Sequence, residues 1–220
     1  MNNPIATIDI LGDKPSDIII TGSSAFKKQA FEDLQKLSSI QLTMLPDGKV
    51  IRTTDVIETR LNLHFGLELT NGTVETKNLV SLKPKPKPTG TALVLELIDS
   101  KHTVAIAQST GNGTTSPKSP NNSNGIGDNS NVGYNPTKTG ANIVNVDNTM
   151  GRPPYIGLAH ELAHAEHHVK GTYDGTIEKN LTDPENPKVK GLLTKDEVNV
   201  RKTDSKIRKE QGVVERKQPY

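Results

Sequence analysis

The composition of residues 155–169 predicts a helix that packs against the interior of the protein. Its apolar and small residues are Ile156, Gly157, Leu158, Ala159, Leu162, Ala163 and Val169. We expect this helix to begin near Pro154 and to end at Gly171, because glycine readily adopts the left-handed conformation that follows a helix. Residues 160–164 read H-E-L-A-H. His160 and His164 therefore lie one turn apart on one face.

Two imidazoles at this spacing can hold one metal ion, and Glu161 then lies beside the metal, where a general base is needed. The pattern is typical of zinc hydrolases. It also arises by chance in roughly 1% of chains with this content of His and Glu. The alternative is an amphipathic helix whose histidines face solvent. The apolar back of the helix and its small residues favour the zinc site.

The helix contains two further histidines, which are not expected to join the same ion. His168 lies eight residues after His160, about 12 Å along the axis, whereas the nitrogens on one zinc ion must lie within about 4 Å of one another. His167 is close to His164 but points away from the shared site. We predict that both line the rim or the surface.

A third ligand must come from another segment, and two candidates remain. Asp174, within Gly171–Gly175, resembles the Asp ligand of aspzincin peptidases, although an Asp beside Gly175 can equally be a turn residue. Glu197, in the predicted last helix, matches the gluzincin arrangement. The spacing of Thr194 and Glu197 also fits a capping box, which would explain Glu197 without a metal.

The composition excludes several other classes of protein. The chain has 220 residues, no Cys, no Trp and a net charge of +2. The small net charge gives no general reason to expect binding to nucleic acid or to a membrane. No run of about 18 apolar residues predicts a membrane span, and Met1–Ala6 does not look like the start of a Sec-type signal peptide.

The predicted fold class is α+β. Strands are expected at 17–21, 103–108 and 141–147, and helices at 25–37, 91–99 and 195–211, in addition to the histidine-bearing helix. Pro46–Gly48 and Asn71–Gly72 predict turns in a small antiparallel sheet that includes Leu61–Leu69 and Val74–Val80. The polar segment 109–135 is expected to be a long loop, either a lid over a site or disordered.

Residues 83–88, with the sequence KPKPKP, predict an extended spacer or, as the alternative, a basic ligand for a partner. The spacer would divide the chain into an N-terminal α/β portion at 1–82 and a second portion at 89–220. One continuous domain over 17–220 is the alternative.

The segment Tyr155–Ala165, preceded by Arg152 and Pro153, resembles the NleD-like effector metallopeptidases, especially those at the C-termini of Rhs-type polymorphic toxins. The resemblance covers roughly 88–220, with a weaker match at 17–38. It extends upstream through residues 88–98, 104–106, 133–136 and 140–147, and downstream through Asp196–Glu197, residues 206–212, Arg216 and Tyr220. This chain departs from the family at Asp204–Ser205, where the family often has Glu-Asn.

The resemblance implies a zincin-like fold in which the active-site helix packs under a small mixed sheet and beside a C-terminal helix. It implies Zn²⁺ held by His160, His164 and Glu197, with Glu161 as the base. It also implies a secreted effector that cuts proteins of a target cell, delivered on a carrier, for instance by type VI secretion, and neutralised by an immunity protein. Neither nucleic acid nor a membrane is an expected partner.

Two roles in the predicted reaction stay open. Tyr173, Tyr155, Arg208 and Tyr220 are candidate donors to the oxyanion. The strand at 141–147 is a candidate edge strand for the substrate backbone. The rival functions are a metal-stabilised binding module without catalysis and a basic binder that uses Lys83–Lys87 and residues 201–217.

Overall fold

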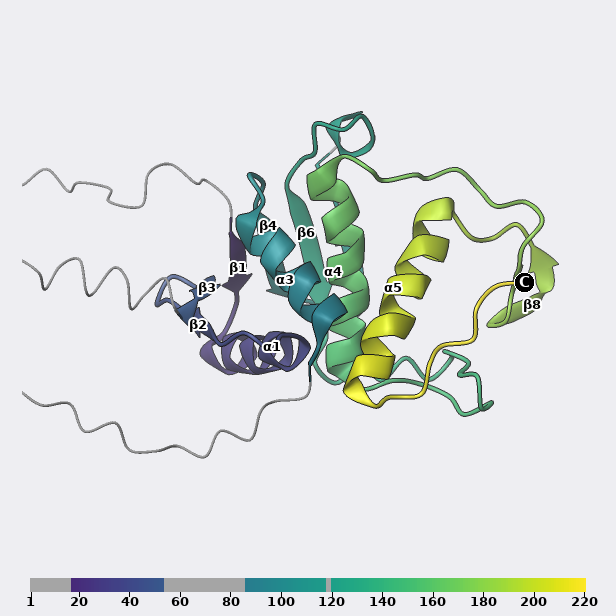
Figure 1. The fold of residues 1–220 in the computed structure, drawn as a ribbon, viewed down its shortest axis with the longest axis horizontal. Coiled ribbons are helices and arrows are strands. Elements are labelled where there is room, and N and C mark those ends of the chain that lie inside the picture. The colour runs from purple at the N-terminus through teal and green to yellow at the C-terminus, as the bar shows by residue number, and fades with distance from the viewer. Residues whose placement is uncertain (1–16, 54–85, 118–119) are drawn as a thin grey trace, which may run out of the picture.

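The computed structural model describes residues 17–53, 86–117 and 120–220. Within them a six-stranded mixed sheet packs against helices, as the predicted α+β class requires (Figure 1). The elements in chain order are β1 (Ile18–Thr21), α1 (Ser24–Leu37), β2 (Leu42–Met44), β3 (Lys49–Arg52), α3 (Pro88–Asp99), β4 (Val104–Gln108), β5 (Gly113–Thr115), the 3-10 helix η1 (Pro120–Ser123), β6 (Ser130–Tyr134), α4 (Pro154–Lys170), β7 (Thr182–Asp183), β8 (Asn186–Lys190) and α5 (Lys195–Gln211).

The sheet has the strand order β2-β3-β1-β4-β6-β5. Its centre is parallel, since β4 pairs in parallel with both β1 and β6. The outer strands are antiparallel: β3 pairs with β1, β2 with β3, and β5 with β6. Alternate residues of the central strands, such as Ile18, Ile20, Val104 and Ile106, are fully buried, so one face of the sheet forms part of the core. The strand β5 closes one edge of this sheet.

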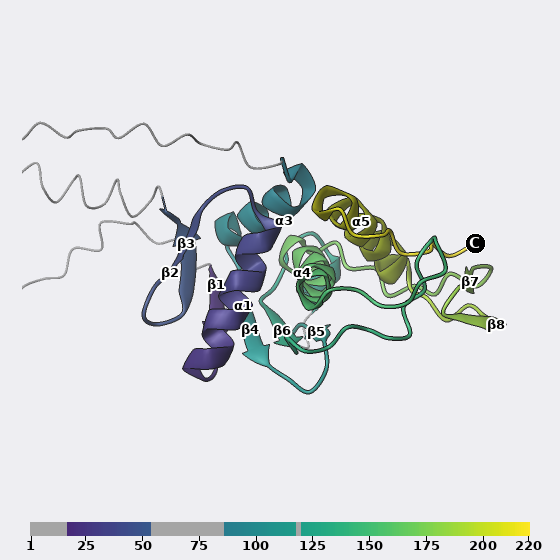
Figure 2. The same cartoon turned by 90° about the horizontal axis from the view of Figure 1, so that it is seen from below.

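The helix α4 lies at the centre of the molecule, between β6 on one side and α5 on the other (Figure 1). Seen end-on in Figure 2, it is surrounded by α1, α3, α5 and the strands β6 and β5. Its residues Ile156, Leu158, Ala159, Leu162 and Ala163 are completely buried. The predicted apolar back of this helix is therefore confirmed, and the helix is a fixed support for the histidines on its remaining face. None of the described helices is long and apolar enough to cross a membrane.

Most of the predicted elements are confirmed within a few residues. The helix α4 runs from Pro154 to Lys170 and is followed by Gly171 at φ 69°. A side chain at Gly171 would collide with the backbone of Asn121, Gly125 and Gly127. Both the positive φ and this lack of space therefore require glycine at the position. The helix α3 begins at Pro88, not near Thr91, because proline at a first helical position lacks only an N–H that would be unpaired there anyway. Residues Leu61–Leu69 and Val74–Val80 lie outside the described residues.

The predicted strand at 141–147 is wrong. The chain turns back on itself here: the N–H of Asn145 donates to the carbonyl of Thr149, and Val144 pairs with Met150 in an isolated bridge. The side chain of Asp147 accepts from the N–H and the hydroxyl of Thr149, and Asn148 has a positive φ of 66°. Local hydrogen bonds from Asp and Asn thus overrule an alternating pattern that suits a strand.

The predicted long loop at 109–135 is also wrong over much of its length, because β5, η1 and β6 lie in it. Residues 118–119 are outside the described range. The strand β6 is buried at Ser130, Val132 and Tyr134, and it pairs with strands on both sides. Its Gly and Asn content hid it, since these residues are depleted in most strands.

The elements before and after the undescribed residues 54–85 share one sheet, because β1 pairs with both β3 and β4. They also share one cluster of buried side chains. This is the arrangement expected for one domain over 17–220. The division at residues 83–88 stays a prediction.

Candidate metal centre

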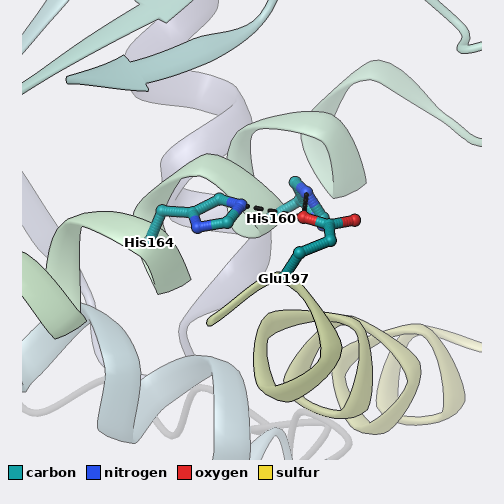
Figure 3. Close-up of side chains that lie close together, drawn as sticks. All are labelled: His160, His164 and Glu197. Atoms are coloured by element: carbon teal, nitrogen blue, oxygen red, sulfur yellow. Dashed lines mark hydrogen bonds and ion pairs between the residues drawn. The ribbon is translucent and has the colours of Figure 1, made fainter. Parts of the chain in front are cut away.

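The helix α5 brings Glu197 to the histidine face of α4. Thr194 caps α5, and its hydroxyl accepts a hydrogen bond from the N–H of Glu197 at 3.1 Å. This is half of the predicted capping box. The Glu197 carboxylate points instead to the two imidazoles (Figure 3). Helix capping therefore explains the position of the Thr194 hydroxyl. It does not explain why the Glu197 side chain points to the histidines.

His160, His164 and Glu197 converge on one point. The Oε2 atom of Glu197 lies 3.1 Å from Nε2 of His164 and 3.4 Å from Nε2 of His160. One ligand atom from each of the three residues lies within 4.8 Å of the other two. Among the described residues, this is the group of His, Cys, Asp and Glu that could hold a metal ion.

The arrangement fits a tetrahedral metal such as zinc. Ligand atoms about 2.1 Å from a tetrahedral ion lie about 3.4 Å from one another, close to the two distances from Glu197. Two imidazoles and a carboxylate form a donor set that zinc accepts, and three protein ligands leave a fourth position for water or substrate. The residues present therefore fit a divalent ion of this kind.

Asp196 holds the far side of His164. Its Oδ2 atom lies 2.5 Å from Nδ1 of His164, and its Oδ1 atom lies 2.5 Å from Nδ1 of His167. A carboxylate on Nδ1 fixes the ring orientation and leaves Nε2 to face the metal position. His167 is thus a partner of Asp196 and is not one of the three converging residues. The sequence analysis missed the role of Asp196, whose only signal was its position next to Glu197.

Asp204 has a comparable position behind His160, although at a longer distance. Its Oδ2 atom lies 3.7 Å from Nδ1 of His160, and neither atom has a hydrogen-bond partner among the described residues. Asp204 is fully buried, and its Oδ1 atom accepts a hydrogen bond of 3.0 Å from Nε of Arg208. Asp204 therefore places a buried carboxylate behind His160.

A set of buried charged residues, which we call the ion-pair network, contacts Glu197 on the side away from the histidines. Arg201 donates to Oε1 of Glu197 at 2.6 Å and pairs bidentately with Asp183. Arg216 pairs bidentately with Glu185 and lies 3.5 Å from Oε1 of Glu197. The network comprises Arg201, Arg208, Arg216, Asp183, Glu185, Glu197 and Asp204. It fixes one oxygen of Glu197, which leaves Oε2 to face the histidines.

These contacts shift the pKa values of the metal-free protein. Burial alone lowers the pKa of His164, but the carboxylates of Asp196 and Glu197 outweigh it and raise that pKa from 6.5 to about 9. Burial raises the pKa of Glu197, and the two imidazoles and Arg201 reverse this and hold it far below its usual range. Glu197 is therefore ionised, which is the state that binds a cation.

Glu161 lies beside this centre, in a cleft of about 600 Å³ that also contains His160, His164 and Glu197. The hydroxyl of Thr114, on β5, lies 2.9 Å from both the carbonyl and the Oε2 atom of Glu161. Residues 113–116 form one wall of this main cleft. The sequence analysis missed Thr114, because it assigned β5 to a loop.

The other candidate residues lie in different places. Asp174 lies at the surface with its side chain 44% exposed, and it accepts from the N–H of Thr176, as the turn explanation predicted. His168 lines the main cleft but is buried against Ser130 and Tyr173, so it is not a surface residue. Among the four candidate oxyanion donors, only Tyr173 is among the residues that line the cleft.

Comparison with known families gives a match to a family of peptidases. The model of peptidase family M91, described as an effector protein, matches residues 83–218, which are more than half of the 220 residues. The matched range contains α3, the strands β4–β6 and the three converging residues. No curated protein matches the chain. The chain therefore belongs to peptidase family M91, a metallopeptidase-type family of effector proteins.

Proposed function

We propose that this protein is a zinc-dependent endopeptidase that acts as a secreted effector or toxin on proteins of a target cell. The observation that carries the proposal is the convergence of His160, His164 and Glu197 within 4.8 Å of one another, with Glu161 in the same cleft. Membership of a peptidase family supports the reaction class. In this proposal Glu197, and not the surface residue Asp174, is the third ligand.

Zinc held by His160, His164 and Glu197 would polarise the peptide carbonyl and make a bound water molecule more acidic. Glu161 then accepts the proton of the attacking water and delivers it to the leaving amine. The Thr114 hydroxyl, 2.9 Å from the Glu161 carboxylate, orients that carboxylate for the transfer. Tyr173, in the wall of the cleft, is the candidate donor to the oxyanion.

We propose that the substrate backbone lies along β5, which takes the role expected of residues 141–147. As the last strand in the sheet order, β5 has one side that pairs with no other strand of the described sheet. Its residues line the main cleft next to Glu161. An extended peptide that joins this edge would have its backbone held by main-chain hydrogen bonds.

The biological setting rests on family resemblance. We propose that the protein reaches its target cell through a dedicated secretion system, on an Rhs-type carrier, and that a cognate immunity protein blocks it. The alternative function is a metal-stabilised binding module without catalysis. Both functions need the metal, but only the peptidase needs Glu161.

The variant Glu161→Gln separates these two functions. It keeps the size and the hydrogen-bonding capacity of the side chain but cannot act as a base at neutral pH. We expect it to bind one zinc ion per chain, as the wild type does, and to lose at least roughly 100-fold in the rate of peptide cleavage. Mass spectrometry of new N-termini in proteins exposed to each form measures the cleavage, and metal analysis measures the zinc. Equal cleavage or equal toxicity of the two forms would contradict the peptidase function.

A further inference from the structure

A second pocket adjoins the main cleft and shares His160 and Glu161 with it. This side pocket has a volume of about 170 Å³. Its other lining residues are Asn112, Lys138, Gly140, Asn142, Ile143, Arg152, Glu185 and Arg216. A typical small-molecule site is larger, at least about 300 Å³. The size and the position next to Glu161 suit a single side chain of a bound peptide, next to the bond that is cut.

Cations outnumber carboxylates by three to two in the lining of this side pocket. Its cations are Lys138, Arg152 and Arg216, and its carboxylates are Glu161 and Glu185. Glu185 is neutralised by its bidentate pair with Arg216. Lys138 is exposed and forms no ion pair with any of the described residues. The two cations of this lining that form no hydrogen-bonded pair with a carboxylate of the described residues are therefore Lys138, which is exposed, and Arg152, which is buried.

Arg152 is the more informative of the two. Its side chain is only 7% exposed, yet Nε and Nη1 have no hydrogen-bond partner among the described residues. Its nearest carboxylate oxygen, Oδ2 of Asp204, lies 3.6 Å from Nη1, which is an ion pair but is too long for a hydrogen bond. Buried guanidinium groups are normally hydrogen-bonded, since leaving one unpaired costs free energy. Because Arg152 also lines the side pocket, a bound molecule can offer its guanidinium group a further acceptor.

We propose that the side pocket is a specificity subsite for an acidic side chain, Asp or Glu, in the substrate residue that flanks the scissile bond. Arg152 and Lys138 would both contact its carboxylate, and the fork of the guanidinium group matches carboxylate geometry. The inference rests on the proposed peptidase function and adds the substrate class that this function leaves open.

The test uses the zinc-loaded full chain and pairs of peptides. A peptide library first identifies a cleaved sequence, and the residues on both sides of the cut are then varied between Glu and Gln. We expect kcat/KM to be about tenfold higher for Glu than for Gln at one of these positions, as for a hydrogen bond to a charged group. Equal rates for Glu and Gln at every flanking position would overturn the inference and leave the peptidase function intact. Absence of cleavage of any peptide would overturn both.

Charge reversal at Lys138 tests the pocket itself. Because Lys138 is exposed, Lys138→Glu should fold normally, and it should lower the Glu/Gln preference at that position at least about threefold. Lys28, on α1, is also exposed, so Lys28→Glu is the matched control and should leave the preference unchanged. Arg152→Gln should abolish the preference and Arg152→Lys should restore part of it. If Lys138→Glu shifted the preference no more than Lys28→Glu, the side pocket would not be the subsite.

Discussion

Replacing Glu197 by Gln is the sharpest test of the metal centre. The substitution keeps the shape of the side chain but removes the charge from the Oε2 atom that lies 3.1 Å and 3.4 Å from the two imidazoles. Structural zinc sites with four ligands bind with about 10–16 kcal/mol, so one ligand contributes about 3 kcal/mol. We therefore expect zinc affinity to fall about 100-fold.

The metal-free fold should tolerate this change. Arg201 keeps its bidentate pair with Asp183, and the amide oxygen of the substituted side chain can still accept from Nε of Arg201. The hydrogen bond from Arg201 becomes one to a neutral acceptor, which costs about 1–2 kcal/mol and lowers Tm by only a few degrees in a chain of this size. A large loss of zinc affinity with a small change in the Tm of the metal-free protein is the expected signature.

Competition with a chromophoric chelator measures the zinc affinity of the wild type, Glu197→Gln and Asp174→Asn. Asp174 lies at the surface and is bonded locally to Thr176, so Asp174→Asn is the matched control and should bind zinc like the wild type. Wild-type affinity in Glu197→Gln, or a comparable loss in Asp174→Asn, would refute the assignment of the third ligand.

Three further predictions concern the residues around the centre. Asp196→Asn should weaken zinc binding by about 10- to 100-fold, because the Nδ1 atom of His164 loses its carboxylate partner; His167→Gln, which spares that contact, should have a smaller effect on the same titration. In the metal-free protein the pKa of His164 is raised from 6.5 to about 9, so its protonated form stabilises the fold fully below pH 6.5 and this contribution is lost as the pH rises through 9. The Tm of the metal-free protein should therefore fall between pH 6.5 and 9. Zinc affinity should rise over the same interval, because zinc displaces the proton of His164. A constant Tm over this interval would contradict the raised pKa of His164. Thr114→Val should lower kcat about tenfold with unchanged zinc affinity, because Glu161 loses its hydrogen bond from Oγ1; an unchanged kcat would show that Thr114 does not orient the base.

The sequence predicted the part of the site that depends on local geometry. Residues His160 and His164 share a helix face because their spacing is four, which holds in any fold that keeps the helix. Helix length likewise excluded His168 from a shared ion, and the structure does not include it among the converging residues. The choice between Glu197 and Asp174 needed the family resemblance, since both have an ordinary local explanation.

The parts that the sequence could not predict depend on tertiary contacts. Thr114 reaches Glu161 only because β5 pairs with β6 across a segment rich in Gly and Asn. Asp196 reaches two histidines only because α5 packs against α4. At 141–147 the opposite happened, because local Asp and Asn side chains formed a turn where the alternating pattern predicted a strand.

The ion-pair network beneath Glu197 has a consequence for the conditions in which the protein can work. The Debye length shrinks from about 8 Å at physiological ionic strength to about 3 Å at 1 M salt, and exposed charge pairs weaken accordingly. The pair between Lys195 and Asp174, with side chains 46% and 44% exposed, belongs to that class. The side chains of Arg201, Arg208 and Arg216 are at most 5% exposed, so ions in solution cannot come between them and their carboxylates. We therefore expect the ion-pair network to keep the Glu197 carboxylate oriented towards the histidines at 1 M salt as well as at low ionic strength.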